Sequence, residues 1–302
     1  MRAPAVLLGL ALGDALGAPF EGRRRVPAGQ IEEWCRADAP LRWTDDTHMA
    51  LVLARQLLAD RTLADPDALG DAFAAAYADE PWRGYGAGPP QIYALAARGL
   101  GYEQAAASLF GGSGSFGNGA AMRVAPVALV PPPGDDVEVA RLARVQARLT
   151  HTHPEAVAGA QVVARVVARL LGLEAPDTEV VRHTVTEVVD DTQPGLVRER
   201  LHDALVELDL HGDAARTAAR VGTGVAAAAS VPAAVIALLA GRDLLGSITT
   251  AIGFGGDTDT IAAMAGAMAG AAWGLGDVPA SMLSRLEACE ELADLARRLR
   301  AT

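Results

Sequence analysis

Cysteine and aromatic residues are both scarce in this chain of 302 residues. Only two cysteines are present, Cys35 and Cys289, which argues against a disulfide framework or a zinc site and favours a reducing, cytoplasmic setting. Aromatic residues make up 4% of the chain, whereas hydrophobic residues make up 51%. The core must therefore consist mainly of Ala, Leu and Val, which suits close helix–helix packing better than a sandwich of strands.

The sequence also lacks a block of basic residues, and its net charge is −11. We expect no direct binding to nucleic acid, because that contact depends on Lys and Arg facing the phosphate backbone. A small substrate that carries phosphate remains open, since backbone N–H groups can hold phosphate oxygens without a basic side chain.

A long uninterrupted apolar run is missing as well. The richest stretch, 222–239, is interrupted by Ser230 and Pro232, so no membrane-spanning segment is expected. The first 14 residues could be taken for a short secretion signal, but Asp14 interrupts them and similar small-residue segments recur later. We expect this stretch to form a buried first helix.

Apolar residues recur at helical spacing along most of the chain. A helix is predicted over 45–59, where Met49, Leu53 and Leu57 define one face. The Val- and Thr-rich stretch 180–189 resembles a strand, but its position between helical segments favours a helix. Similar helical patterns cover three further segments: 137–149, 155–173 and 196–209. With no internal repeat and no linker between domains, the sequence predicts an all-α protein.

The most unusual stretch is 255–260, Gly-Gly-Asp-Thr-Asp-Thr, at the start of an Ala-, Met- and Gly-rich helix. One such side chain is enough to cap a helix, so a second carboxylate adds repulsion unless a cation offsets it. Because that helix is apolar enough to be buried, Asp257 and Asp259 need a partner, and the stretch predicts a hard metal ion. A calcium-binding EF-hand is excluded, because Ile261 and Met268 stand where its oxygen ligands belong.

A second acidic cluster, Thr44-Asp45-Asp46-Thr47, lies directly before another predicted helix. Taken alone, it is equally compatible with a plain capped helix. Together the two clusters offer four carboxylates, whose oxygens suit Mg²⁺ or Mn²⁺, and two such ions could share one bridging carboxylate. Glu21 leaves an apolar helix into a Gly-rich turn; it is either a surface residue or a further ligand or proton carrier.

A Gly- and Ser-rich loop over 110–119 leads into a short helical segment. The bare N–H groups of such a loop can cradle phosphate, and Phe110 and Phe116 could clamp a flat base; the alternative is a flexible linker. The loop lacks the Lys-Ser/Thr pair of a P-loop, and no strand precedes it. His151 and His153 stand at a helix start, where a capping or surface role is the common case.

In chain order, these motifs resemble those of the ADP-ribosylglycohydrolases, which include ADP-ribosyl-dinitrogen reductase hydrolases and ADP-ribosylhydrolases. The resemblance rests on Glu21 after Gly-Ala-Pro-Phe, 44–47, Gly117-Asn118-Gly119 before Met122-Arg123, His151, and 255–260. It implies an all-α, single compact orthogonal helical bundle that forms one domain over residues 1–302. The stretch 83–88 and Ser230-Val231-Pro232 are similar to the branch that acts on serine-linked ADP-ribose, poly(ADP-ribose) and O-acetyl-ADP-ribose.

The resemblance also implies roles for single residues. One ion would be held by Thr44, Asp45, Asp46 and Asp259, and a second by Glu21, Asp257, Asp259 and Thr260. The diphosphate and distal ribose would be bound by Gly114, Ser115, Phe116, Gly117 and Asn118, with His151 on the ribose or a phosphate. Phe110 and Phe116 would stack the adenine, and Gly84 and Gly86 would also bind substrate. Two departures stand out: Ser113 replaces a larger basic residue of some relatives, and Phe116 replaces a tyrosine.

The implied activity is hydrolysis at the anomeric carbon of ADP-ribose, with two Mg²⁺ (or Mn²⁺) ions and with Glu21 or Asp257 handling protons. The partners would be ADP-ribose and ADP-ribosylated proteins or small molecules, and we expect a cytoplasmic monomer that does not bind membranes. The alternatives are an arginine-specific ADP-ribosylhydrolase, a non-catalytic ADP-ribose reader, a crystallin-like structural protein, and an unrelated Mg²⁺ phosphohydrolase.

Overall fold

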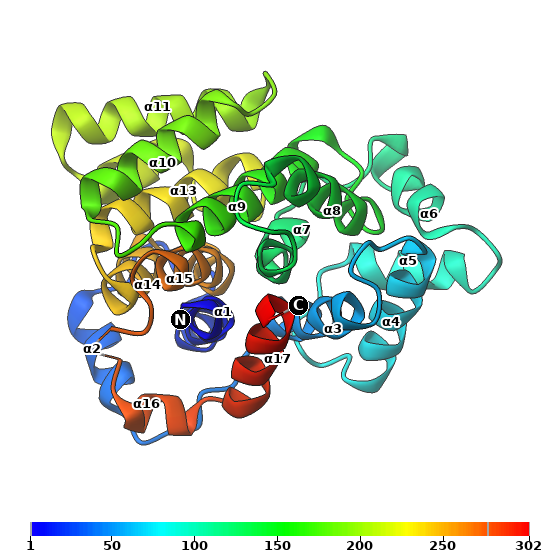
Figure 1. The fold of residues 1–302 in the computed structure, drawn as a ribbon, viewed down its shortest axis with the longest axis horizontal. Coiled ribbons are helices and arrows are strands. Elements are labelled where there is room, and N and C mark those ends of the chain that lie inside the picture. The colour runs from blue at the N-terminus through cyan, green and yellow to red at the C-terminus, as the bar shows by residue number, and fades with distance from the viewer. Residues whose placement is uncertain (1, 277, 302) are drawn as a thin grey trace.

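The computed structural model describes residues 2–276 and 278–301, and these form helices joined by short loops (Figure 1). The described residues contain no strand, only two isolated bridges. The fold is all-helical, as predicted. The α-helices are α1 (Ala3–Gly17), α2 (Ala28–Arg36), α3 (Asp45–Ala59), α4 (Pro66–Asp79), α5 (Gly88–Ala96), α6 (Tyr102–Ser108), α7 (Gly119–Met122), α8 (Asp136–Arg148), α9 (Pro154–Gly172), α10 (Thr178–Asp190), α11 (Leu196–His211), α12 (Ala214–Val221), α13 (Ala227–Gly241), α14 (Leu244–Phe254), α15 (Thr258–Trp273), α16 (Ala280–Arg285) and α17 (Cys289–Ala301). Three short 3₁₀ turns lie at Ala18–Phe20, Phe110–Gly112 and Ala125–Leu129.

Helices α1 and α15 pack side by side in the middle of the molecule, and other helices surround them (Figure 1). Their backbones touch, which only glycine allows at the crossing points. A Cβ atom on Gly13 would lie 2.0 Å from the carbonyl oxygen of Ala262, and one on Gly266 would lie 2.1 Å from that of Gly9. This contact joins the first helix to the one that carries the 255–260 motif.

The surrounding helices follow the predicted segments closely. The expected helix over 45–59 is α3, and those over 137–149, 155–173 and 196–209 correspond to α8, α9 and α11. The Val- and Thr-rich stretch 180–189 lies within α10, so the helix prediction for it is confirmed. Helices α10 and α11 lie at one end of the molecule and α4 to α6 at the other (Figure 1).

The first helix corrects one expectation. By length and composition, Ala3–Phe20 is long and apolar enough to cross a membrane, with a mean hydropathy of 1.5 over 18 residues. The prediction that no stretch reaches this length was therefore wrong. In the fold, 83% of the stretch is buried against other helices, so the prediction of a buried first helix is confirmed.

Candidate active site

A cavity of about 300 Å³ lies where the starts of α3 and α15 meet the Gly-rich loop before α7. Five carboxylates face it, together with neutral polar groups and backbone from the loops. Most of the predicted site residues line this one cavity: Glu21, Thr44, Asp45, Asp46, Gly84, Gly86, Phe110, Ser115, Gly117, Asn118, His151, Asp257, Asp259 and Thr260. Segments more than 200 residues apart in the sequence thus meet at one place.

Gly114 and Phe116 are the two predicted residues that do not line the cavity. Gly114 is buried on the Thr152 side of the loop, where a Cβ atom would lie 2.0 Å from the Thr152 hydroxyl. Phe116 is 48% exposed and borders a neighbouring hollow, with its ring centroid 6.0 Å from that of His153. The two aromatic rings proposed as a clamp, Phe110 and Phe116, therefore border different hollows.

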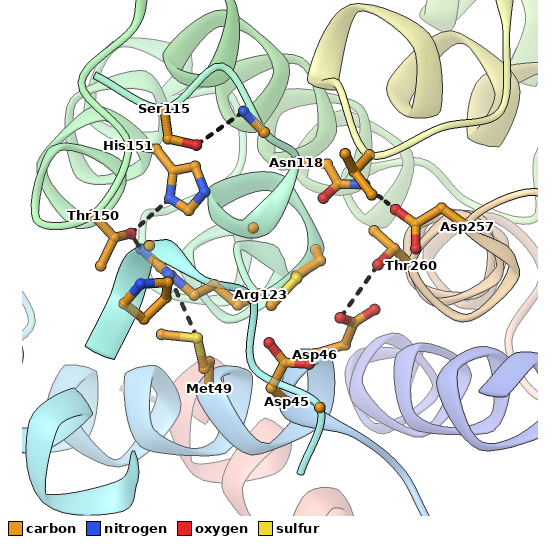
Figure 2. A pocket seen from close by; sticks show the side chains of 18 of the residues that line it. Asp45, Asp46, Met49, Ser115, Asn118, Arg123, Thr150, His151, Asp257 and Thr260 are labelled. Atoms are coloured by element: carbon orange, nitrogen blue, oxygen red, sulfur yellow. Dashed lines mark hydrogen bonds between the residues drawn. The ribbon is translucent and has the colours of Figure 1, made fainter. Parts of the chain in front are cut away.

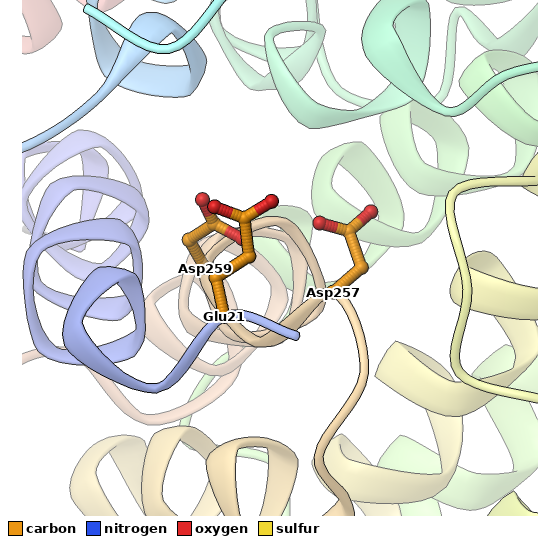
Figure 3. Close-up of side chains that lie close together, drawn as sticks. All are labelled: Glu21, Asp257 and Asp259. Atoms are coloured by element: carbon orange, nitrogen blue, oxygen red, sulfur yellow. The ribbon is translucent and has the colours of Figure 1, made fainter. Parts of the chain in front are cut away.

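Three carboxylates converge beside the start of α15. Oxygen atoms of Glu21, Asp257 and Asp259 all lie within 4.8 Å of one another, close enough to share one metal ion (Figure 3). Glu21 is exposed at the end of the turn that follows α1, whereas the two aspartates are buried. Contact between α1 and α15 sets this arrangement, because each carboxylate is attached to one of these helices or to the turn beside it.

The second acidic cluster meets the first across the cavity. The hydroxyl of Thr260 lies 3.4 Å from Oδ1 of Asp46, which links the starts of α15 and α3 (Figure 2). The other oxygen of Asp46, Oδ2, is buried without a hydrogen-bond partner in the described chain. A buried acceptor without a partner is costly, and a bound cation would satisfy it.

Helix capping does not explain either cluster. Thr44 and Asp257 occupy the N-cap positions of α3 and α15, as a capping role requires, but neither side chain accepts a capping hydrogen bond. The Thr44 hydroxyl donates to a buried aspartate instead, and the Asp257 carboxylate accepts from Asn118. The side chains at these helix starts are therefore turned toward the site rather than toward their own helices.

The carboxylates repel one another strongly. Burial and the neighbouring acids raise the pKa of Asp45 to about 8, and that of Asp46 well above its usual range. Burial and the charge of Asp257 raise the pKa of Asp259 to about 7. The charge of Asp259 and partial burial raise the pKa of Glu21. Uncompensated negative charge of this kind is what a divalent cation neutralises, and the all-oxygen donor set suits Mg²⁺ or Mn²⁺.

Asp14 is a residue of this region that sequence reasoning treated only as an interruption of an apolar stretch. It is fully buried in α1, and its carboxylate accepts hydrogen bonds from the backbone N–H and the hydroxyl of both Thr44 and Thr47 (2.6–3.1 Å). These bonds fix the first turn of α3, which carries Asp45 and Asp46. In the sequence, an aspartate within an otherwise apolar helix was the signal that could have pointed to this role of Asp14.

The opposite wall is the Gly-rich loop, which hydrogen bonds tie to the segment before α13 and to the start of α15. The segment before α13 accepts hydrogen bonds from the N–H of Asn118 at Val225 and from the N–H of Asp257 at Thr223 (2.9 and 2.8 Å). The Asn118 side chain donates to Asp257 Oδ2 at 2.6 Å (Figure 2). The loop is thus tied to the acidic cluster, which identifies it as a wall of the site rather than a flexible linker.

The stretch 83–88 forms the rim of the cavity beside α3. The carbonyl of Arg83 accepts from the N–H of Asp45 at 2.8 Å, and the Arg83 guanidinium is held by Glu80 and Glu287. Gly84 has φ of +98°, and a Cβ atom there would lie 3.5 Å from Asp45 Oδ1. Glycine at this position leaves the carboxylate open to the cavity.

The family model for ADP-ribosylglycohydrolases matches residues 1–302. The chain belongs to the ADP-ribosylglycohydrolase family. This ADP-ribosylglycohydrolase is 33% identical to ADP-ribosylhydrolase ARH3 of Danio rerio, over 99% of this chain and 90% of that protein. Identity to ADP-ribosylhydrolase ARH3 of Homo sapiens is 32%, over 97% and 91%. A solved structure described as an ADP-ribosylglycohydrolase-related protein complex superposes with a TM-score of 0.77 at 30% identity, covering 99% of this chain and 97% of that one.

Proposed function

We propose that this chain is a dinuclear Mg²⁺ (or Mn²⁺) hydrolase that cleaves the glycosidic bond at the anomeric carbon of ADP-ribose. One observation carries the proposal: five carboxylates, one with an unsatisfied buried oxygen, face the same cavity as the Gly-rich loop and His151. An acidic wall suits divalent cations, and a wall of backbone and neutral donors suits the diphosphate and ribose of a nucleotide. Similarity to two proteins named ADP-ribosylhydrolase ARH3 supports ADP-ribosylhydrolase activity, and the resemblance of 83–88 and 230–232 to the serine branch favours a serine-linked, polymeric or O-acetyl substrate.

The residues present fit two ions. Thr44, Asp45, Asp46 and Asp259 would hold one, and Glu21, Asp257, Asp259 and Thr260 the other, with Asp259 shared. When bound, these ions would orient the ribose hydroxyls and lower the pKa of a water molecule. Asp14 keeps the first turn of α3 in place for this, and Asn118 fixes the orientation of Asp257.

Glu21 is better suited than Asp257 to carry a proton. Its side chain is exposed at the edge of the site, where it can exchange protons with solvent, and the charge of Asp259 raises its pKa, which favours the proton-carrying form. Asp257 is buried and already accepts a short hydrogen bond from Asn118. We therefore assign Glu21 to donate a proton to the leaving oxygen or to accept one from the attacking water.

A side-by-side assay tests the proposal. Protein with Mg²⁺ is incubated with serine-linked, arginine-linked and O-acetyl ADP-ribose, and the products are identified by mass. Intact ADP-ribose from the serine or O-acetyl substrate is the expected result. Release only from arginine would reassign the substrate to the arginine branch. Tight binding of ADP-ribose without release would make the chain a reader, and AMP as the product would make it a phosphohydrolase.

A further inference from the structure

A chain of hydrogen bonds connects a fully buried arginine to the wall of the cavity. The Arg123 guanidinium lies 2.7 Å from the Thr150 hydroxyl through Nη2, and the same hydroxyl lies 2.7 Å from His151 Nδ1 (Figure 2). All three residues are buried, and all three border the cavity. The proposed function gives Arg123 and Thr150 no role, so their arrangement needs its own explanation.

Arg123 is held firmly, and within residues 2–276 and 278–301 it forms no ion pair. Its Nε donates to Gln146 Oε1 at 2.8 Å, its Nη2 also donates to the Gln146 carbonyl at 2.9 Å, and it stacks over Phe73 at 4.5 Å. Among the described residues, no carboxylate lies within ion-pair distance of it. A guanidinium fixed in this way can serve as a donor of fixed direction.

The direction of each hydrogen bond follows from the donors available. A guanidinium only donates, so the Thr150 oxygen must accept from Arg123. The single hydroxyl hydrogen of Thr150 then needs an acceptor, and in the described part of the chain the one within reach is His151 Nδ1. If Nδ1 carried the proton instead, the buried hydroxyl hydrogen would have no acceptor, which is unfavourable. Nδ1 therefore accepts, and in the neutral ring the proton sits on Nε2.

The other face of the His151 ring borders the loop that leads into α7. A Cβ atom on Gly119 would lie 3.0 Å from Nε2, and one on Gly117 would lie 3.5 Å from it, so these glycines leave the ring exposed to the cavity. Nε2 has no hydrogen-bond partner among the described residues. Burial and the Arg123 charge lower the pKa of His151 to about 3, which keeps the ring neutral.

We propose that Arg123 and Thr150 are positioning residues that lock His151 in the Nε2–H tautomer, so that it presents a donor to an acceptor oxygen of the bound ligand. The identity of the ligand as ADP-ribose rests on the proposed function, whereas the tautomer does not. A locked donor suits a phosphate or ether oxygen, which can only accept, and does not suit a group that must donate. The relay thus contributes to ligand recognition by fixing which ring nitrogen of His151 carries the proton.

The tautomer is measured directly by nitrogen NMR of histidine-labelled protein in EDTA, without ligand. The chain has six histidines, so the His151 signals are assigned by their loss in His151→Gln. A protonated Nε2 and an unprotonated Nδ1 in the wild-type protein are expected. A protonated Nδ1 overturns the proposal, whatever the variants do.

Two variants then test the relay. Thr150→Ser keeps the hydroxyl and should retain the tautomer, with a Kd for ADP-ribose within about twofold of wild type. Thr150→Val removes it and should let the Nδ1–H form appear, with a Kd raised about tenfold. Retention of the wild-type tautomer and affinity in a folded Thr150→Val variant contradicts the proposal. Failure of the wild-type protein to bind ADP-ribose counts against the proposed function, while the NMR result still decides the tautomer.

Discussion

Replacing Asp259 by Asn should make the metal-free protein more stable, although Asp259 is buried and central to the site. Burial and the charge of Asp257 raise its pKa from 3.8 to about 7. Each pKa unit corresponds to about 1.4 kcal/mol, so keeping this carboxylate charged in the metal-free fold costs about 4 kcal/mol. Asn has the same shape, and its oxygen can still accept the hydrogen bond that the N–H of Thr260 gives to Asp259. Since the carboxylates are coupled, we expect a measured gain of roughly 2–4 kcal/mol at pH 8.

The pH dependence of the free energy of unfolding shows independently that the charged Asp259 destabilises the metal-free fold. Between pH 4 and 7 the unfolded chain has lost the Asp259 proton while the folded chain keeps it, so the folded state binds more protons. The contribution of Asp259 to the free energy of unfolding of the metal-free wild type must therefore fall as pH rises through this window and level off above it. In Asp259→Asn that fall should be smaller, because one of the groups responsible for it is gone.

Urea denaturation in EDTA at pH 5 and pH 8 measures both effects. Asp14→Asn is the matched comparison, since burial also raises the pKa of Asp14 to about 7, but both of its oxygens accept hydrogen bonds from Thr44 and Thr47. An amide would turn an N–H group toward these donors at a cost of about 1–3 kcal/mol, which offsets the relief from removing the buried charge, so Asp14→Asn should gain less stability at pH 8 than Asp259→Asn. With Mg²⁺ present, wild type should gain stability and Asp259→Asn should not. A metal-free Asp259→Asn variant less stable than wild type at pH 8 would refute the reasoning.

Three further predictions follow from the fold and the site. Glu21→Gln should lower kcat at least about a hundredfold in the ADP-ribose release assay. It should change the free energy of unfolding by less than about 0.5 kcal/mol, because Glu21 is exposed. Near-normal turnover would show that Glu21 does not carry the proton. Phe110→Ala should raise the Kd for ADP-ribose about tenfold by calorimetry and leave Mg²⁺ binding unchanged, because Phe110 lines the cavity. Phe116→Ala, whose ring borders the neighbouring hollow, should raise the Kd less; a larger effect from Phe116→Ala would show that the base stacks on Phe116 instead. Gly13→Ala should unfold the protein or lower its melting temperature sharply, because the new Cβ would lie 2.0 Å from the Ala262 carbonyl; wild-type melting would show that α1 and α15 can separate at little cost.

The helices were predictable because their signal is local. Apolar residues at three-to-four spacing and turn residues between them require no knowledge of distant parts of the chain. The unusual acidity of 44–47 and 255–260 was visible for the same reason. The family resemblance added the expectation that the two clusters meet, and 14 of the 16 predicted site residues line one cavity.

The residues that the sequence did not reveal have partners that lie far away along the chain. The hydrogen-bond partners of Asp14 are 30 and 33 residues away, and the Thr150 hydroxyl that Arg123 binds is 27 residues away. Which way a loop side chain faces is equally non-local: Phe116 turns to the His153 side because the loop is pinned by the segment before α13. Periodicity and composition carry no information about such pairings.

The most direct test of the account is to add Mg²⁺ or Mn²⁺ to the EDTA-treated protein and follow the products formed from serine-linked ADP-ribose by mass. We predict no release in EDTA, release of intact ADP-ribose once the divalent ion is added, and none from Asp259→Asn under the same conditions. Equal release in EDTA and in Mg²⁺, or full activity of Asp259→Asn, would contradict the assignment of the acidic cluster as the metal centre of a hydrolase.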